Sequence, residues 1–251
     1  MKVLATYSIK GGVGKTTSAV NLAYEAGESG ARVLVWDLDP QGAATFFLRT
    51  KPRVRGGVER LVGSKGELAS NLRSTDFPAI HVVPGDFSLR HLDVHLDATK
   101  HPMRRLATLL DPLDAHYDVA ILDCAPGITL TSESVFRACD ALLVPTIPTP
   151  LSARTLVQLR DFLAAESGSR EPPTLMPFLS MVDRRKKLQR QLVDDLRLEW
   201  PDLLPTAIPN ASTFERMGTE RAPVGVFAPD TIAAKAFRDL WSDIASLLWP
   251  G

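Results

Sequence analysis

Short apolar runs without polar alternation recur along the chain, separated by stretches with the spacing of helices. The apolar runs lie at residues 3–7, 33–36, 119–122, 141–144 and 175–181. The helical patterns lie at 16–29, 102–116, 132–138, 152–167, 188–199 and 231–248. Strands that are apolar on both faces and alternate with helices indicate a sheet buried on both sides. The pattern therefore predicts an α/β fold with a mostly parallel central sheet and helices on both faces.

The organisation of the chain favours a single domain over residues 1–251. No repeat, low-complexity tract or long linker interrupts the pattern. Residues 51–100 are the least regular, and we expect peripheral helices there with one strand at 80–83. A chain of 251 residues is long enough for one large α/β domain.

The composition excludes few classes of function. Lys plus Arg and Asp plus Glu both number 29, so the formal net charge is zero and any binding of nucleic acid requires a local basic patch. The two cysteines, Cys124 and Cys139, are too few for a disulfide framework, which favours a reduced, cytoplasmic setting. No run of about 18 apolar residues occurs, so no membrane span is expected.

Candidate chemistry begins with the segment SIKGGVGKTT at residues 8–17, which lies between the first strand and the first helix. Glycines at this junction let backbone N–H groups approach phosphate oxygens, and the helix N-terminus adds partial positive charge. Lys15 is expected to reach the β and γ phosphates, and the Thr16 hydroxyl to ligate Mg²⁺. The ordinary loop begins with a glycine where this chain has Ile9, and it lacks a second lysine such as Lys10.

Carboxylates follow two of the predicted strands. Asp123 ends the apolar run of VAILDCAPG, where open α/β sheets collect ligands, and Pro126 and Gly127 then form a loop suited to sensing a γ-phosphate. Asp37 and Asp39 follow the run at 33–36 and point the same way on an extended segment. A hydrolase needs a group that orients the attacking water. Either carboxylate can supply it, and we favour Asp39, which a proline follows.

Three segments carry a family resemblance. KGGVGKTT at 10–17, WDLDPQGAAT at 36–45 and LDCAPG at 122–127 resemble the deviant Walker A, switch I and switch II segments of ParA/MinD-type ATPases. The ParA (Soj) branch is the most similar, and the resemblance continues through 145–159, 181–196 and 206–240 in order and spacing. Two loops depart from the family pattern: DCAPGI replaces DCPPSL, and STFERMGTERAP replaces RLSEAPSHGKP.

The resemblance implies a P-loop ATPase that uses ATP and Mg²⁺ and forms a homodimer with two ATP molecules sandwiched in its interface. Lys10 would then cross to the nucleotide of the partner subunit, and Asp39 would position the hydrolytic water. Asp123 would hold Mg²⁺ through water, and Thr17 would contact the α-phosphate. The remaining expected nucleotide contacts are Gly11, Gly12, Val13, Gly14, Lys15 and Thr16 around the phosphates, and Met181 and Pro209 at the adenine.

The same resemblance implies non-specific binding of DNA in the ATP state, which would associate the protein with the nucleoid. A separate ParB-like or cargo-adaptor protein would stimulate hydrolysis. The candidate DNA contacts are a run at the predicted start of the helix at 188–199 and two later arginines: Arg184, Arg185, Lys186, Lys187, Arg190, Arg216 and Arg221. Cations at a helix N-terminus lie against the helix dipole, which favours an anionic partner, although a solvated charged turn explains such a run as well.

Two alternatives remain open. A MinD-like membrane-associated ATPase would use the C-terminal helix as an amphipathic anchor. The charges of that helix are mixed, with Asp239 and Asp243 offsetting Lys235 and Arg238, so we expect it to pack against the core. A metabolic enzyme of the same superfamily would use ATP to activate a carboxylate, and it would need a substrate pocket that the sequence does not identify.

Overall fold

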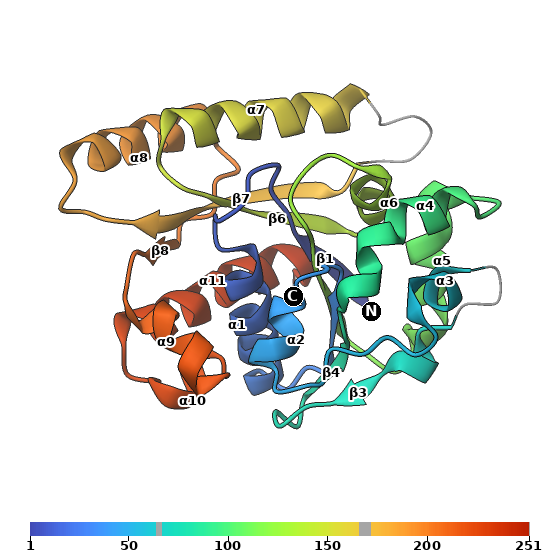
Figure 1. Cartoon of the computed structure of the whole chain (residues 1–251). Helices are drawn as coiled ribbons and strands as arrows, with labels where there is room; N and C mark the ends of the chain where they lie inside the picture. Colours follow the sequence, from blue (N-terminus) through green and yellow to red (C-terminus); the bar gives the residue numbers. More distant parts are fainter. Residues whose placement is uncertain (64–66, 166–171, 251) are drawn as a thin grey trace.

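A computed structural model describes residues 1–63, 67–165 and 172–250. An eight-stranded sheet crosses the molecule in the order β3-β4-β2-β5-β1-β6-β7-β8 (Figure 1). Every pairing is parallel except that of β3 with β4. This confirms the predicted fold class. The strands are β1 (Lys2–Thr6), β2 (Val33–Asp37), β3 (Arg73–Ser74), β4 (Ile80–Val83), β5 (Val119–Asp123), β6 (Ala141–Thr146), β7 (Thr174–Val182) and β8 (Ala207–Pro209).

Helices cover both faces of this sheet. Side chains alternate between the faces along each strand, so Leu34 and Trp36 of β2 join one buried cluster while Val33 and Val35 join the other. The first cluster is closed by α3 (Gly57–Val62), α4 (Leu92–Asp97), α5 (Arg105–Leu110), α6 (Leu130–Ala138), α7 (Pro150–Ala165) and α8 (Lys187–Glu199). The second is closed by α1 (Lys15–Glu28), α2 (Ala43–Phe47), α9 (Thr213–Glu220), α10 (Val224–Phe227) and α11 (Ile232–Leu248).

One predicted helix is shorter than expected. The pattern at 102–116 resolves into a 3₁₀ turn at Pro102–Arg104, the short α5, and a second 3₁₀ turn at Asp111–Leu113. Pro112 has no N–H to continue an α-helical ladder, and α5 ends just before it. The predicted helix at 152–167 corresponds to α7, although its residues 166 and 167 lie outside the described residues.

The C-terminal helix α11 packs against the sheet and α1, as its mixed charges predict. Phe237, Leu240 and Trp241 are buried, and the Trp241 indole Nε1 donates to the Ser29 hydroxyl at 3.0 Å. Its apolar face is thus occupied within the fold. Over the parts of the chain that the structure describes, no helix combines the length and apolar character needed to span a bilayer.

Candidate nucleotide-binding site

The phosphate-loop segment lies between β1 and α1, as the sequence predicts. Gly14 precedes α1 with φ of 96°, and a Cβ at that position would lie 3.1 Å from the Ser180 hydroxyl oxygen of β7. Glycine therefore serves both the backbone conformation and the close approach. The same Ser180 hydroxyl donates to the Val13 carbonyl at 2.9 Å, which fastens the loop to the sheet. The resulting helix N-terminus is suited to phosphate binding.

The two lysines of this loop have different environments. Lys15 is buried, and its Nζ donates to the Lys10 carbonyl at 3.4 Å. Burial lowers the pKa of the Lys15 ammonium, while the charges of Asp123, Cys124 and Asp39 oppose that effect. The Lys10 side chain is half-buried, and it has no ion-pair partner among the described residues.

Parallel strand register brings the predicted carboxylates together. Asp123 at the end of β5 pairs in register with Thr6 of β1 on one side and Asp37 of β2 on the other. The Thr6 hydroxyl donates to Asp123 Oδ1 at 3.3 Å. Because β1 leads directly into the phosphate loop, the two acids lie at the same edge of the sheet as Lys15.

Asp123 has the features of a site for a divalent cation. Its side chain is fully buried, and its Oδ2 has no hydrogen-bond partner within the described structure. Burial raises the pKa of the Asp123 carboxyl well above its usual range, the charge of Asp37 adds to that rise, and a hydrogen bond from Thr16 opposes it. An unpaired carboxylate oxygen beside a threonine hydroxyl fits the oxygen ligands of Mg²⁺. The described residues contain no group of three or more His, Cys, Asp or Glu that could hold a metal ion.

Asp37 and Asp39 differ in what holds them. The buried Asp37 accepts hydrogen bonds from the Thr45 hydroxyl at 2.6 Å and the Thr45 N–H at 2.8 Å. Burial raises the pKa of Asp37 to about 6, against these hydrogen bonds. Asp39 is only half-buried, and its Oδ1 accepts from the Gln41 N–H at 2.9 Å. Asp37 therefore shapes the segment, and Asp39 is the carboxylate available to a water molecule.

Gly85, which follows β4, was not among the candidates. A Cβ there would lie 2.8 Å from both Asp37 Cγ and the Asp39 carbonyl oxygen, and its N–H donates to the Thr45 hydroxyl at 2.8 Å. The segment Pro84-Gly85-Asp86 directly follows the predicted strand at 80–83. A glycine just past a buried strand next to the ligand edge was the available signal for this close approach.

The loop after β5 is tied to the phosphate-loop strand. Tyr7 directly follows β1, and its hydroxyl donates to the Gly127 carbonyl at 2.9 Å. Pro126 lies beside Gly11, with 4.0 Å between its Cγ and a Cβ placed on that glycine. Cys124 is buried and its thiol pKa is raised by burial, in agreement with a structural role.

The candidate adenine contacts lie at the ends of β7 and β8. Met181 has φ of 54°, and its Cε lies 3.8 Å from a Cβ placed on Gly14. Pro209 ends β8 and lines an open cleft of about 850 Å³ with Val182 and Asp183 among others. The cleft extends to Lys235 and Asp239 of α11. Met181 therefore adjoins the phosphate loop, and Pro209 faces a cavity beyond it.

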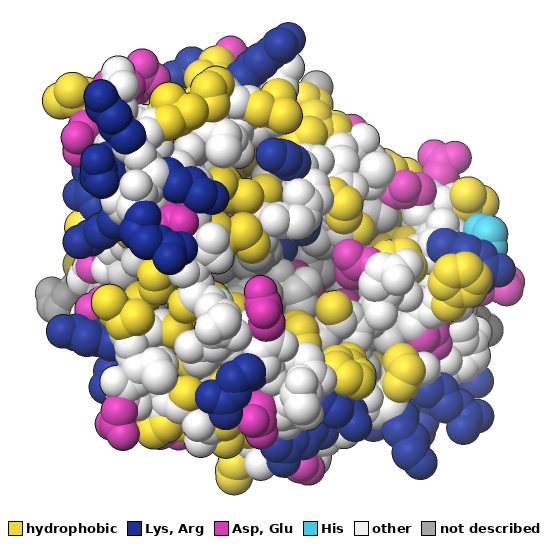
Figure 2. All heavy atoms as spheres, turned by 60° about the vertical axis from the view of Figure 1, so that its left-hand side comes forward, with side chains coloured by type: hydrophobic (Ala, Val, Ile, Leu, Met, Phe, Trp, Pro, Cys, Tyr) yellow, Lys and Arg dark blue, Asp and Glu magenta, His cyan; other side chains and the backbone are white. Residues whose placement is uncertain are grey.

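The predicted basic run is exposed at the start of α8. Figure 2 shows Lys and Arg side chains gathered on the upper left of the face that it presents. Of the cations in this run, only Arg185 and Lys186 have an ion-pair partner in the described chain, and that partner is the buried Asp183. Arg185 lowers the pKa of the Asp183 carboxyl to about 2. The exposed cations of this run, called here the α8 patch, are Arg184, Arg185, Lys186, Lys187 and Arg190.

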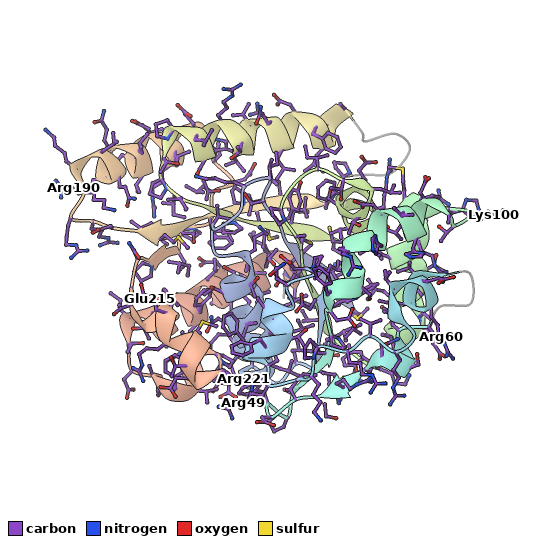
Figure 3. The ribbon with its side chains drawn as sticks, viewed as in Figure 1. Arg49, Arg60, Lys100, Arg190, Glu215 and Arg221 are labelled. Carbon is purple, nitrogen blue, oxygen red and sulfur yellow. The ribbon has the colours of Figure 1, made fainter. Side chains whose placement is uncertain are left out.

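The two later arginines do not continue this patch in the same way. Arg221 lies far from Arg190 (Figure 3) and stacks on Phe46, with its Nε donating to the Phe46 carbonyl at 3.1 Å. Arg216 pairs with Glu220 at 3.0 Å and stacks on Phe227. The spacing of residues in the sequence could not predict where these two arginines lie relative to the α8 patch, because they belong to other elements.

Taken together, the fold and the loop define a P-loop nucleotide-binding protein. A family model described as an AAA domain matches residues 1–167. The chromosome partitioning protein ParA of Caulobacter vibrioides is 30% identical over 215 residues, which cover 83% of this chain and 80% of that protein. Soj of Bacillus subtilis, a sporulation initiation inhibitor protein, is 26% identical over 98% of both chains. The chain belongs to the ParA/Soj family of deviant Walker A ATPases, a family of partition and positioning ATPases.

Solved structures agree with this assignment. A Mycobacterium smegmatis structure described as cobyrinic acid a,c-diamide synthase, with bound ATP analogue and magnesium, matches with a TM-score of 0.84 and 25% identity over 99% of this chain and 96% of that one. McdA of Cyanothece has the same fold, with a TM-score of 0.82 and 23% identity over 97% and 99% of the two chains. The similar structures thus include one that holds an ATP analogue with magnesium.

Proposed function

We propose that this protein is an ATP-driven positioning switch that works as a homodimer. ATP closes two copies face to face, the closed dimer holds DNA without sequence preference, and hydrolysis releases it. The observation that carries the proposal is Lys10, a half-buried lysine of the phosphate loop without an ion-pair partner in the described chain. One lysine, Lys15, suffices for the nucleotide of its own subunit. A second, uncommitted cation at the loop is suited to phosphates presented by another molecule.

The roles of the site residues follow from their positions. Lys15 and the loop N–H groups bind the phosphates, and Thr16 with Asp123 would hold Mg²⁺, which when bound neutralises charge that develops on the phosphates. Asp39 accepts a hydrogen bond from the attacking water and aligns it with the γ-phosphate. Thr17 is assigned to the α-phosphate. Met181 and Pro209 are assigned to the adenine, a role that the cleft beside Pro209 supports.

The α8 patch is the proposed contact with DNA. Five cations within seven residues, with one carboxylate partner in the described chain, leave positive charge available for phosphates. Contacts of this kind are independent of sequence and weaken steeply with salt. The ATP-bound dimer would therefore associate with the nucleoid in the cytoplasm. A separate ParB-like or cargo-adaptor protein, bound to the cargo, would stimulate hydrolysis.

Two alternatives are tested beside this proposal. A MinD-like membrane function would need the apolar face of α11, and that face is occupied by α1 and β8. The likeness to the structure described as a diamide synthase keeps a carboxylate-activating reaction open. Co-sedimentation with anionic liposomes that disappears on deleting residues 235–251 would favour the membrane function. ATP turnover that depends on an added carboxylic acid would favour the metabolic one.

The decisive experiment uses Asp39→Ala to keep ATP uncleaved. This variant with ATP and magnesium should retain duplex DNA of unrelated sequences at low salt, and it should release the DNA with ADP. Lys15→Ala, which cannot hold the phosphates, is the matched control and should not retain DNA with either nucleotide. If Asp39→Ala binds ATP but retains no DNA at low salt, the proposed function is wrong.

A further inference from the structure

A second basic surface lies away from the α8 patch. A groove of about 580 Å³ runs between the segment that follows α2 and strand β3. Its lining contains no acidic and no apolar side chain among the described residues. We call it the arginine groove, and its lining residues are Arg49, Thr50, Lys51, Arg53, Arg55, Arg73 and Ser74.

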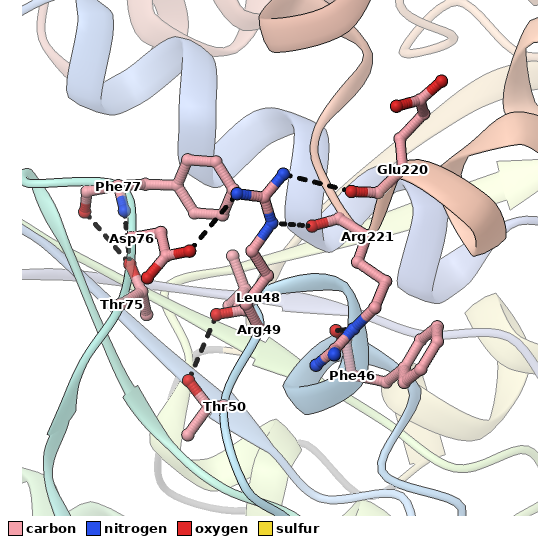
Figure 4. A network of polar contacts seen from close by, with 9 residues as sticks. All are labelled: Phe46, Leu48, Arg49, Thr50, Thr75, Asp76, Phe77, Glu220 and Arg221. Carbon is pink, nitrogen blue, oxygen red and sulfur yellow. Dashed lines mark hydrogen bonds and ion pairs between the residues drawn. The ribbon is translucent and has the colours of Figure 1, made fainter.

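One arginine of the groove has a structural task. Arg49 donates from Nε to the Arg221 carbonyl at 2.8 Å and from Nη2 to the Glu220 carbonyl at 3.1 Å, and it pairs with Asp76 at 3.2 Å (Figure 4). In the other direction, the Arg221 side chain donates a hydrogen bond to the Phe46 carbonyl. These contacts fasten the end of α2 to the end of α9. The guanidinium of Arg49 is therefore committed to the fold.

The other cations of the groove are uncompensated. Within the described chain, Lys51, Arg53 and Arg55 are exposed and have no ion-pair partner. Arg73 donates only to the carbonyls of Leu72 and Ser70 among the described residues. Burial lowers the pKa of Arg73, and the charges of Arg55 and Arg53 lower it further, so these guanidinium groups repel one another. A bound anion would remove that repulsion.

The backbone under these cations is held in place. The N–H of the buried Val54 donates to Asp86 Oδ2 at 2.7 Å, and the Arg55 N–H donates to Asn71 Oδ1 at 2.8 Å. Pro52 packs near Gly42, with 3.8 Å between its Cβ and a Cβ placed on that glycine. The charged side chains therefore project from an anchored segment, which reduces the entropy lost when an anion orders them.

The chemistry of the lining identifies the occupant. Arginine forks match phosphate oxygens in a bidentate geometry, and exposed cations on both walls of an open groove suit a polyanion with repeated charges. A docked protein would need apolar or aromatic anchors, and the groove offers none. We infer that the arginine groove binds the phosphate backbone of nucleic acid, as a second contact separate from the α8 patch. This inference rests on the proposed function, because it extends the DNA contact of the same protein.

The position of the groove makes this a distinct site. In Figure 3, Arg190 of the α8 patch lies at the upper left and Arg49 of the groove lies well apart from it, at the lower edge of the molecule. The groove also begins at the end of α2, the helix that holds Asp37 through Thr45. Nucleic acid in the groove would therefore lie beside the segment that carries Asp39.

The test compares the salt dependence of DNA binding between two triple variants. The groove variant carries Lys51→Gln, Arg53→Gln and Arg55→Gln, and the control variant carries Arg60→Gln, Lys100→Gln and Arg104→Gln on exposed residues outside the groove. Both also carry Asp39→Ala and are measured with ATP on a random-sequence duplex. Each phosphate contact contributes about 0.9 to the slope of log K against log salt. The groove variant should lose about two to three units of slope and at least about tenfold in low-salt affinity, while the control triple should lose less than one unit.

A second measurement remains informative if the groove variant folds poorly. Acetylation of Lys51 in the Asp39→Ala protein is followed with and without saturating duplex, with Lys100 as the internal control. Protection of Lys51 but not of Lys100 supports the inference. Protection by polyglutamate and not by DNA would overturn it in favour of an acidic protein partner.

The remaining outcomes separate the groove from the proposed function. If the groove variant keeps the full slope while Arg184→Gln with Lys187→Gln loses it, the groove inference is wrong and the α8 contact stands. If Asp39→Ala without either triple retains no DNA with ATP, both the groove inference and the proposed function are wrong.

Discussion

The charges at the nucleotide edge of the sheet and the charges on the outer surface of the protein follow different rules. At the nucleotide edge, Lys15, Asp37 and Asp123 are all buried. Strand register fixes Asp37 beside Asp123, and the start of α1 places Lys15. On the surface, Arg184 and Arg190 are exposed and extend into solvent. Burial makes each group of the first region costly to ionise and sensitive to its neighbours. An exposed charge of the second region costs the folded state little free energy and contributes little to its stability. Such a group therefore acquires a role only when a partner binds it.

The largest effect is expected at Lys15. Lys15→Ala removes the buried cation that faces the phosphates, and ATP turnover should fall by on the order of 10³-fold. Steady-state phosphate release measures this loss, and the exposed Lys100→Ala is the matched control. Equal turnover in the two variants would contradict the assignment of the phosphate site.

Asp39→Ala should lower turnover by on the order of 10²- to 10³-fold, because the attacking water loses the carboxylate that orients it. ATP affinity should change little, since the proposed role of Asp39 is a contact with the attacking water and not with the phosphates. Phosphate release and equilibrium nucleotide binding separate the two effects, with the exposed Asp97→Ala as control. A parallel loss of ATP affinity and turnover would assign Asp39 to binding instead.

Asp37 is expected to make the free energy of unfolding depend on pH. Its pKa is raised to about 6 in the folded protein, from 3.8, so the folded state binds a proton more tightly than the unfolded state does. The free energy of unfolding of the nucleotide-free protein should therefore fall as the pH rises from about 4 to about 6, by up to about 3 kcal/mol relative to Asp37→Asn. Denaturant unfolding between pH 4 and 7 measures the difference. A constant difference across that range would contradict the raised pKa.

The smallest expected effect is a difference in stability between variants of Arg221 and Arg184, two candidate DNA contacts in the sequence. Arg221→Met loses a hydrogen bond to the Phe46 carbonyl and the stacking on that ring, which should lower the free energy of unfolding by about 1 kcal/mol. Arg184→Met should change it by less than about 0.5 kcal/mol. Urea unfolding compares the two. DNA affinity should show the reverse order, and an equal effect of both variants on stability would remove the distinction between them.

The sequence was most informative where backbone geometry leaves few choices. The strands β1, β2, β4, β5, β6 and β7, the phosphate loop and Asp123 could be placed because apolar runs define strands and parallel strand ends meet at one edge. The short β3 and β8 were not predicted. Gly85 was missed because its role arises from a contact with Asp37, which lies far away in the sequence. The fate of Arg221 could not be read from the sequence either, because its partner at Phe46 belongs to another element. The helix predicted at 102–116 ends early, before Pro112, so at that point proline position outweighs apolar spacing.

In the proposed function, ATP joins two copies of this chain through Lys10. Sedimentation of Asp39→Ala with ATP and magnesium tests it directly, beside the double variant that also carries Lys10→Ala. We expect twice the monomer mass for Asp39→Ala with ATP and the monomer mass with ADP. The double variant should keep the monomer mass with ATP although it still binds ATP. A double variant that dimerises with ATP as fully as Asp39→Ala would contradict the role assigned to Lys10.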